Sequence, residues 1–492
     1  MATASLLSIY LPLPVPVGLG RASHTIFLLI MMTTSRLTLL GQLTGRAFRC
    51  LARIGACLTV IPAMVMAQTT PAASGDYTLS GADIEAHFQS TYIWQHKAAF
   101  DAPYTGEHSL LTRPEHSYTF SATAFFGVRL RPGTELYIDP EVIQGTPLSG
   151  LYGLGSPTNG EIQKVAGPTP LAYLPRVFLR HTWQLGGTQE SVASSANQMA
   201  GIQASERLVL SVGKMAVTDV FDLNTYAHDP RTQFMTWASL ASGPYDYVAD
   251  AQGYTWGGAL EYFNGDWALR AGRFIGPKES NGQNLNFAIG RFHGDQIEFE
   301  HHHEIDGHAG AVRLLGWRNV ENMGRYDDAM AFAATNGGEP DVGNVRRPNV
   351  KHGWGLHVEQ ALTDNVGCFA RYGWADGRTE TYSFEEVDRS AQLGLSFNGA
   401  LWRRAEDTAG MLLIRNGLSS AHRAYLAQGG LGFFIGDGQL NYRQEQVVET
   451  YYNVAMAKRF WLGLDVQHIA NPAYNADRGP VNVYAIRLHA EY

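Results

Sequence analysis

Acidic and basic side chains recur at alternating positions of apolar, aromatic-rich segments, where they could bind a polyhydroxylated solute. An Arg side chain only donates hydrogen bonds and a carboxylate only accepts them, whereas a sugar hydroxyl does both. Rows of mixed sign therefore suit a neutral polyol better than an ion. The alternative is that these side chains pair with each other and hold a protein wall in shape. The candidate binding residues are Arg129, Arg180, Arg207, Arg270, Arg313, Arg371, Arg487, Glu261, Glu298, Glu300, Glu359, Glu449, Asp465 and Gln467.

A second candidate region is the aromatic-rich segment 219–237, which is long enough to fold into a pore and narrow it. The alternative is a surface loop that only covers an edge. The polar and aromatic residues that we expect to contribute to such a constriction are Asp219, Asp222, Asn224, Tyr226, Asp229, Arg231 and Gln233.

The segment His301-His302-His303-Glu304, followed by His308, has the residue types of a metal site. On a strand, however, successive side chains point to opposite faces, so these residues cannot all converge on one ion. We therefore predict a solvated patch near the rim, with a weak cation site beside Glu298 and Glu300 as the alternative. The sequence indicates no resident metal and no cofactor.

Motifs for catalysis are missing from the sequence. There is no Gly-x-Ser-x-Gly elbow, no His-Glu-x-x-His helix and no phosphate-binding loop. The adjacent pairs Asp327-Asp328 and Glu385-Glu386 would point apart, whereas a glycosidase needs two carboxylates facing each other across a sugar. We predict that the protein is not an enzyme. A periplasmic β-rich protein that binds or degrades glycans, or a barrel enzyme, stays the remote alternative.

The elements that would position these residues are strands, because hydrophobicity alternates with period two in segments of roughly ten residues. In Tyr118–Arg129, one face carries aromatic and apolar residues and the other carries Thr, Ser, Gly and Arg, with Phe125 as an exception. Similar alternation recurs over 177–185, 254–262, 366–374, 392–398 and 484–492. The polar face has few Lys and Glu residues, so it resembles the wet interior of a membrane barrel more than the surface of a soluble sandwich.

These patterns predict an all-β fold, an antiparallel transmembrane β-barrel of about sixteen strands with long loops at one end and short turns at the other. Asn264-Gly265 predicts a tight hairpin, and a second short turn is expected near Lys458-Arg459. Ser419–Gln428 predicts a small helix in a loop. The long connections are expected at 144–174, 187–206, 216–251 and 317–350.

The N-terminal residues 1–67 contain five Arg and no Asp, Glu or Lys, and they end in an apolar run with Ala at 67. This pattern predicts a cleaved signal region, in which residues 1–30 could belong to a mis-assigned start, and an uncleaved anchor is the alternative. We expect an N-terminal periplasmic segment at 68–110, which leads into the first strand, and one barrel domain at 111–492. Cleavage would leave Cys368 as the single cysteine, so no internal disulfide could form.

Cleavage would also make the net charge −13, and no stretch forms a basic face, so nucleic acid is excluded as a partner. The same acidity makes preference for anions less expected.

Several stretches of the chain resemble the carbohydrate-selective outer-membrane porins of the OprB type. The most specific are Gly432-Phe433-Phe434-Ile435-Gly436-Asp437-Gly438 and Leu464-Asp465-Val466-Gln467-His468-Ile469-Ala470-Asn471-Pro472. Further similarity lies in 207–238, 254–261, 449–452, 477–480 and 487–492, whereas 1–110 and 301–308 match nothing in the family pattern.

This resemblance implies a sixteen-stranded barrel in the outer membrane of a Gram-negative bacterium, which passes monosaccharides and small oligosaccharides by diffusion. Its partners would be small neutral sugars, outer-membrane lipid and the barrel-assembly machinery, the last through the terminal Tyr492. Whether the barrel is a monomer or a homotrimer stays open. The alternative function is a general or organic-acid porin.

Overall fold

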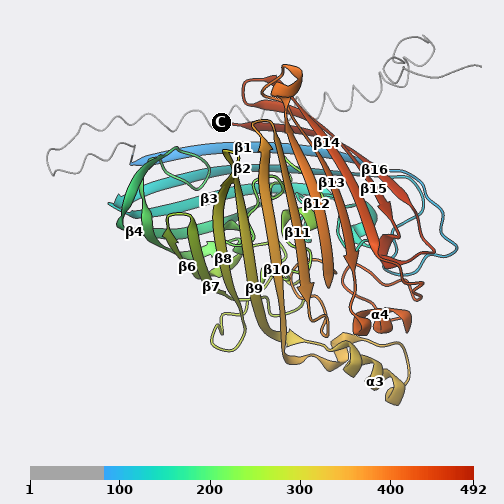
Figure 1. Cartoon of the computed structure of the whole chain (residues 1–492). Coiled ribbons are helices and arrows are strands. Elements are labelled where there is room, and N and C mark those ends of the chain that lie inside the picture. The colour runs from blue at the N-terminus through green and yellow to red at the C-terminus, as the bar shows by residue number, and fades with distance from the viewer. Residues whose placement is uncertain (1–82) are drawn as a thin grey trace, which may run out of the picture. The chain divides into compact units, whose positions relative to one another are not determined.

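The described residues, 83–492 of a computed structural model, form a closed antiparallel barrel of sixteen strands (Figure 1). This confirms the predicted fold class and strand number. The strands are β1 (Ile84–Lys97), β2 (Glu115–Arg131), β3 (Thr134–Thr146), β4 (Leu171–Val192), β5 (Gly201–Met215), β6 (Thr255–Asn264), β7 (Trp267–Phe274), β8 (His293–Ile305), β9 (His308–Met323), β10 (Arg347–Thr363), β11 (Val366–Ala375), β12 (Arg389–Asn398), β13 (Thr408–Gly417), β14 (Glu445–Ala457), β15 (Phe460–Ala470) and β16 (Val481–Glu491).

The barrel closes between its first and last strands, where Thr91 of β1 pairs with His489 of β16 and Ile93 pairs with Arg487. The wall therefore begins at Ile84, and the expected start of the barrel domain at residue 111 was too late. The sequence did not predict this strand, because its outward-facing residues mix aromatic with polar side chains and give a weak apolar signal. These residues are Ser90, Tyr92, Trp94 and His96. The expected signal region lies outside the described residues.

Alternation separates two faces of the wall, as expected. On β2, Thr119, Ser121 and Thr123 are buried inside the barrel, whereas Tyr484 and Ile486 of β16 are exposed on the outer face. Phe125, the exception in the pattern, is buried on the inner side. The alternation over 254–262 predicts that Tyr254 shares the outer face with Trp256, and this prediction is wrong. Tyr254 precedes β6, and its ring lies inside against Arg176.

Long loops and short turns lie at opposite ends of the barrel. The predicted hairpin is confirmed, with Asn264 ending β6 and Gly265 in the left-handed region at φ 57°. The expected long connection at 187–206 was wrong, because β4 and β5 continue through it and leave only 193–200 as the connection between them. Its Gly186-Gly187 bulge and polar residues had masked the strand pattern.

The long-loop end carries two helices, α3 (Tyr326–Asn336) and α4 (Ser420–Ala427), which lie next to each other (Figure 1). Ser419 caps α4 by accepting a hydrogen bond from the backbone of His422, as its sequence predicted. The short helix α2 (Trp237–Leu240) and the 3-10 turns η1 (Leu148–Leu151), η2 (Val217–Asp219), η3 (Val342–Val345), η4 (Gly399–Trp402) and η5 (Pro472–Tyr474) complete the elements. Within residues 83–492, no helix is long and apolar enough to cross a membrane.

Two of the long loops fold back into the barrel and fill much of it. The loop 216–254 contributes Val217, Phe221 and Tyr245 to a hydrophobic cluster with the wall residues Phe274 and Trp317. The loop 147–170 packs beside it, and Trp237 donates a hydrogen bond from its indole to the Asn159 carbonyl over 2.8 Å. The core of the molecule is thus inside the barrel, between these loops and the wall.

Candidate functional site

A cavity of about 770 Å³ occupies the part of the barrel that the inward loops leave free. At the short-turn end it is lined by Arg459, Glu491 and Tyr492. It extends between the wall and the inward loops as far as Glu161 and Arg231. We call this space the inner cavity.

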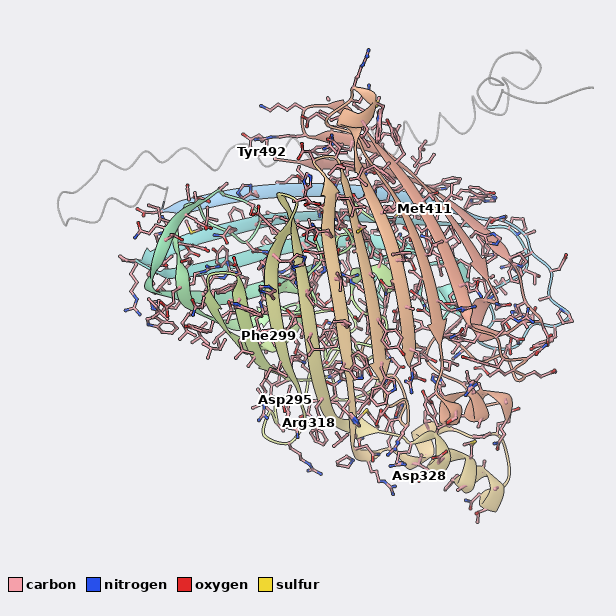
Figure 2. All side chains as sticks on the ribbon, in the orientation of Figure 1. Asp295, Phe299, Arg318, Asp328, Met411 and Tyr492 are labelled. Atoms are coloured by element: carbon pink, nitrogen blue, oxygen red, sulfur yellow. The ribbon has the colours of Figure 1, made fainter. Side chains whose placement is uncertain are left out.

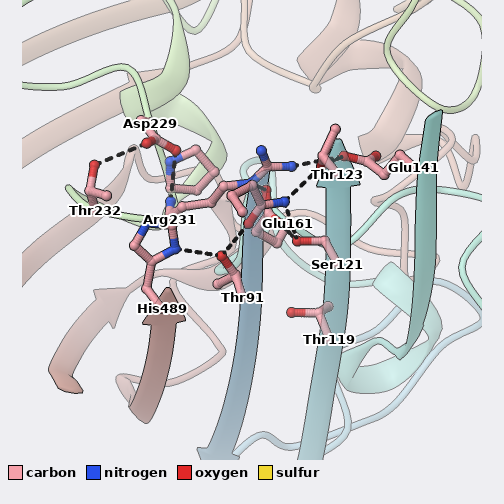
Figure 3. Close-up of polar contacts among 12 residues, drawn as sticks. Thr91, Thr119, Ser121, Thr123, Glu141, Glu161, Asp229, Arg231, Thr232 and His489 are labelled. Carbon is pink, nitrogen blue, oxygen red and sulfur yellow. Dashed lines mark hydrogen bonds and ion pairs between the residues drawn. The ribbon is translucent and has the colours of Figure 1, made fainter. Parts of the chain in front are cut away.

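One part of the wall of the inner cavity is a cluster around Arg231, which comes from the inward loop 216–254 (Figure 3). Its Nε lies 2.9 Å from Glu161 Oε1, and its Nη2 lies 3.0 Å from Glu141 Oε2. Glu141 belongs to β3 and Glu161 to the loop 147–170, so this ion-pair cluster joins two inward loops to the wall. The Arg231 side chain is 18% exposed, and both Arg231 and Glu161 line the inner cavity.

A second ion pair lies beside it, between Arg176 of β4 and Asp219 of the inward loop. The contact is bidentate, with both N–O distances 2.7 Å, and the Asp219 side chain stays 28% exposed. The ring of Tyr254 lies 5.1 Å below the Arg176 guanidinium, and Tyr173 lies 6.0 Å from that ring. We call these three ion pairs, formed by Arg231 with Glu141 and Glu161 and by Arg176 with Asp219, the neck.

Hydroxyl and amide groups continue the neck along β1 and β2. Ser121 donates to Glu161 over 2.5 Å (Figure 3). Gln89 donates to Thr123 over 2.7 Å. Thr91 hydrogen-bonds His489 over 2.7 Å. Donors and acceptors of both kinds therefore lie close together at one place, which is what a ligand with many hydroxyls requires.

Burial shifts the titration of the loop residues in the neck. It raises the pKa of Glu161, although Arg231 opposes that shift. Burial alone would lower the pKa of Arg231, but Glu161 and Glu141 raise it above its ordinary value. Arg231 is therefore a permanent cation, whereas Glu161 takes up a proton at a higher pH than an ordinary carboxylate.

The acidic and basic rows predicted from the sequence do face inward, but in β6 to β9 they pair with each other. Arg270 contacts Glu261 at 3.0 Å and both Glu298 and Glu300 at 3.1 Å. Glu300 also pairs with Arg313. Four of these five side chains are at most 7% exposed and Glu261 is 14% exposed, and none of the five lines the inner cavity. We call this group, with Glu359, the lattice.

The lattice also holds the inward loop. Arg313 contacts Glu359 at 3.2 Å, and Glu359 accepts hydrogen bonds from the backbone and hydroxyl of Thr225 over 2.8 and 2.9 Å. Glu298 accepts a hydrogen bond from the backbone of Asp222 over 2.8 Å.

Other predicted wall residues bind the same loop through its backbone. Arg371 donates to the carbonyls of Ser239 and Ala227 over 2.6 and 2.7 Å. Glu449 accepts from the Thr236 amide over 3.1 Å and lies beside Asp465, which is also buried.

Arg487 and Gln467 reach the loops in the same way. Arg487 donates to the carbonyls of Pro230 and Gln233 over 2.6 and 2.8 Å. Gln467 donates to the Thr158 carbonyl over 2.8 Å. Each of these wall side chains therefore holds an inward loop in place.

The three remaining predicted Arg side chains bond to carbonyls near the short-turn end. Arg129 donates to Ala200 over 2.6 Å, Arg180 to Asn197 over 2.8 Å, and Arg207 to Ala204 over 3.1 Å. None of the predicted wall residues lines the inner cavity.

The predicted loop residues divide into two groups. Asp219, Asp229 and Arg231 line the inner cavity. Asp222 and Asn224 instead face the wall or their own loop. Asp222 pairs with His357 of β10 at 2.6 Å, and Asn224 accepts from the backbone of Tyr226.

Tyr226 lies away from the inner cavity, since its ring packs beside Gly367, where an added Cβ would come within 2.2 Å of it. Gln233 accepts hydrogen bonds from the backbones of His228 and Asp229 and so shapes the loop.

The neck residues Glu141, Glu161 and Arg176, and Tyr254 beside them, were not among the predicted ones. Arg176 shares the inward parity of Arg180, and this signal could have identified it. Glu141 alternates with Asp139 in the same way, but Pro140 interrupts its strand. Glu161 and Tyr254 lie in loops, where no periodicity indicates direction.

A second, smaller cavity of about 240 Å³ lies at the long-loop end. Its lining includes Tyr152, Tyr326, Phe433 and the ion pair Arg346–Glu380, whose N–O distances are 2.8 and 2.7 Å. Aromatic faces and charged groups thus occur at the outer end of the barrel as well.

The His segment at 301–303 alternates between faces as expected. His301 stacks on the outward Trp267 at 3.8 Å, His302 lies 2.7 Å from Glu300, and His303 bonds Gln360 at 2.9 Å. Residues 83–492 contain no group of three side chains placed to hold a metal ion.

The sequence profile of the carbohydrate-selective porin family, the OprB family, matches residues 107–492. Among solved structures, the chain is similar to the high-pH structure of Pseudomonas putida OprB, with 15% identity over 83% of this chain and 94% of that chain and a TM-score of 0.63. The low-pH structure of that protein aligns with 12% identity, coverage of 83% and 93%, and a TM-score of 0.46. Pseudomonas aeruginosa OccK2 aligns with 10% identity, coverage of 83% and 97%, and a TM-score of 0.41. Only the first of these likenesses supports a shared fold, and no curated protein matches the sequence.

Proposed function

The chain belongs to the OprB family of carbohydrate-selective porins, and from this premise we propose that its sugar selectivity is exerted at the neck. The protein is an outer-membrane porin of a Gram-negative bacterium that passes carbohydrates by passive diffusion. The finer question is which side chains touch the sugar on its way.

The observation that carries this proposal is the mixture of charges that lines the inner cavity. Arg231 and Arg176 can donate to sugar hydroxyls, and Glu161 and Asp219 can accept from them. Tyr254 adds an aromatic face under Arg176. Because each cation is already paired with a carboxylate, a passing anion gains little, whereas a neutral polyol can exchange hydrogen bonds with both partners.

We assign a different role to the other predicted residues. Arg270, Arg313, Glu298, Glu300 and Glu359 fix the inward loop against the wall, and Arg371, Glu449 and Arg487 fix its backbone. Asp222 belongs with this group through His357. Selectivity then depends on these residues indirectly, because they determine the position of Arg231 and Asp219.

Membership in a porin family makes the protein a channel, and we further propose that no bond is made or broken during passage. The neck carboxylates Glu141 and Glu161 contact the same guanidinium, so they lie on one side of Arg231 rather than across a gap that a sugar could enter. A glycosidase would need them to face each other across a sugar ring.

Single-channel conductance in a planar bilayer tests the proposal, with glucose and then a neutral non-sugar of similar size added to the bath. Channels that glucose blocks and the non-sugar does not block are the expected result. Equal block by both solutes would favour a general porin, and block by a small organic acid alone would favour the organic-acid alternative. Arg231→Gln should weaken the block by glucose without changing the amount of folded protein.

We also propose that Tyr492 is presented to the barrel-assembly machinery. The side chain is 77% exposed at the end of β16, while its backbone amide bonds the Phe88 carbonyl over 2.8 Å. Deletion of Tyr492 should reduce the amount of heat-modifiable, assembled protein in outer membranes. Normal assembly of that variant would refute the role.

The expected division into a signal region at 1–67 and a mature chain stays a prediction, which N-terminal sequencing of the exported protein checks. Whether the barrel is a monomer or a homotrimer also stays open.

A further inference from the structure

A row of charged residues lies on the outer face of the barrel, where most side chains are apolar. Arg273 of β7, Asp295 of β8 and Arg318 of β9 are direct cross-strand neighbours. Arg273 contacts Asp295 at 2.6 and 3.1 Å, and Arg318 contacts it at 2.6 Å. The two Arg side chains are 49% and 52% exposed, so their guanidinium groups stay accessible beside the membrane.

The position of this row matches the boundary between apolar and polar membrane regions. Further along the same strands, toward the short-turn end, the outward residues are Ile297, Phe299 and Leu314, all of them exposed. Figure 2 shows Asp295 and Arg318 between Phe299 and the end that carries the long loops. Long loops of such barrels face the outside of the cell, so the row lies at the headgroup level of the outer leaflet.

The row has an excess of positive charge and unused hydrogen-bond donors. Two cations share one carboxylate, and the hydrogen bonds use Nε and Nη2 of Arg273 but only Nη2 of Arg318. His352 of β10 is the next cross-strand neighbour of Arg318, and Arg291 is exposed just before β8. Arginine in this arrangement is suited to bidentate recognition of phosphate.

An apolar groove of about 680 Å³ adjoins the row on the same outer face. Trp256 and Gly258 of β6 line it, and the exposed Phe287 and Ile289 of the loop 275–292 lie on its other side. Gly258 is the direct cross-strand neighbour of Arg273, so the groove lies next to the charged row. A glycine at this position leaves the groove open between Trp256 and its neighbours.

We propose that the groove and the row together bind one phosphate-bearing lipid of the outer leaflet, with the phosphate on Arg273 and Arg318 and an acyl chain along Trp256 and Phe287. A second copy of the chain in a two-fold contact fits less well, because that contact would bring the Arg pairs of the two barrels together. A free phosphate would use the row but not the groove. This inference depends on the outer-membrane location and is independent of the sugar site.

The test is native mass spectrometry of the full protein in a neutral detergent, titrated with diphosphoryl lipid A and with the same lipid after removal of its phosphates. We expect one tightly bound diphosphoryl lipid and at least about tenfold weaker binding of the dephosphorylated form, since charge-assisted hydrogen bonds of this kind are worth that factor or more. The double variant Arg273→Gln/Arg318→Gln should bind the diphosphoryl lipid more weakly by the same factor.

Two further variants separate the parts of the site. Phe287→Ser should weaken lipid binding and leave the response to inorganic phosphate unchanged. Arg347→Gln is the matched control, because Arg347 is 62% exposed and pairs with Asp328 outside the row. It should bind lipid as the unmodified protein does. Block of conductance by glucose should be unchanged in all these variants.

Three outcomes would overturn the proposal. Equal binding of both lipid forms would refute the contact between phosphate and the Arg pair. Full displacement of the lipid by millimolar inorganic phosphate would show that the row is a site for a free anion. Dimers that disappear with Phe287→Ser and do not depend on lipid would make the groove an interface between copies.

Discussion

Two sectors of the barrel wall both carry polar residues on their inner face, yet they use them differently. In β6 to β10, the lattice consists of charged side chains that contact one another, with Glu298 fully buried and Arg270 4% exposed. In β1 to β4, hydroxyl and amide side chains such as Thr91 and Ser121 predominate, and the charged Arg176 pairs with a loop residue beside the inner cavity.

This difference shows that a high number of charged side chains on the inner wall indicates where the inward loop is bound to the wall. It does not indicate where a solute passes. Buried charges are stable only when they are paired and hydrogen-bonded, so a sector rich in them is dry and closed. The sector that borders the inner cavity needs fewer charges, because its polar groups can exchange partners with a passing molecule.

The largest expected effect is the loss of Arg270 from the lattice sector. Arg270→Ala would leave three carboxylates without their shared cation, which should destabilise the barrel by about 3–5 kcal/mol. The measurement is the denaturant midpoint of the refolded protein, followed by heat-modifiable mobility in gels. Arg404→Ala is the control, because Arg404 is 50% exposed at the short-turn end and its pair with Asp407 is partly solvated. A similar midpoint for both variants would contradict the distinction between the sectors.

A smaller effect is expected where the lattice sector meets the loop. The Asp222 carboxylate pairs with His357 and accepts a hydrogen bond from the backbone amide of Ser242. Asp222→Asn removes its charge, which should weaken the free energy that holds the loop against the wall by roughly 2–3 kcal/mol. We expect an assembled barrel whose open channel fluctuates between conductance levels. Steady conductance at the unmodified level would show that Asp222 does not hold the loop.

The cavity sector should respond in the opposite way. Arg231→Gln should leave assembly unchanged and weaken block by glucose about tenfold, the loss expected for one charge-assisted hydrogen bond. Concentration-dependent block of single channels measures this factor. If Arg231→Gln instead impaired assembly as strongly as Arg270→Ala, the neck would stabilise the folded barrel in the same way as the lattice, and the distinction between the two would be refuted.

The smallest expected effect is a pH dependence of ion selectivity. Because burial raises the pKa of Glu161, this carboxylate binds a proton above its ordinary range as the pH falls, and the neck becomes more positive. The reversal potential in a salt gradient should therefore shift toward anions between pH 7 and pH 5, with a permeability ratio changed roughly twofold or less. Glu161→Gln should remove the shift, and an unchanged shift would assign it to another group.

Much of the fold could be predicted from the sequence because alternation with period two is a local property. It identified the two faces of β2 and β16, the Asn264-Gly265 hairpin and the capped helix α4. It missed β1, whose outward row is not apolar, and it ended β4 too early at the Gly186-Gly187 bulge.

The candidate site was less predictable. Alternation along a strand shows to which face of the wall a side chain points, but it does not show which other residue that side chain contacts. Arg270 and Arg176 both have inward parity, yet Arg270 contacts three wall carboxylates, whereas Arg176 contacts Asp219 of the inward loop beside the inner cavity.

By itself, the sequence determined a membrane barrel of about sixteen strands and the inner and outer faces of most of them, since these follow from the spacing of apolar and polar residues along each strand. Only the tertiary structure decided where the inner cavity lies and which charges it exposes. The physical reason is that the loops 147–170 and 216–254 fold back over part of the wall, and the path of a loop depends on long-range contacts such as Arg231 with Glu141 and Glu359 with Thr225.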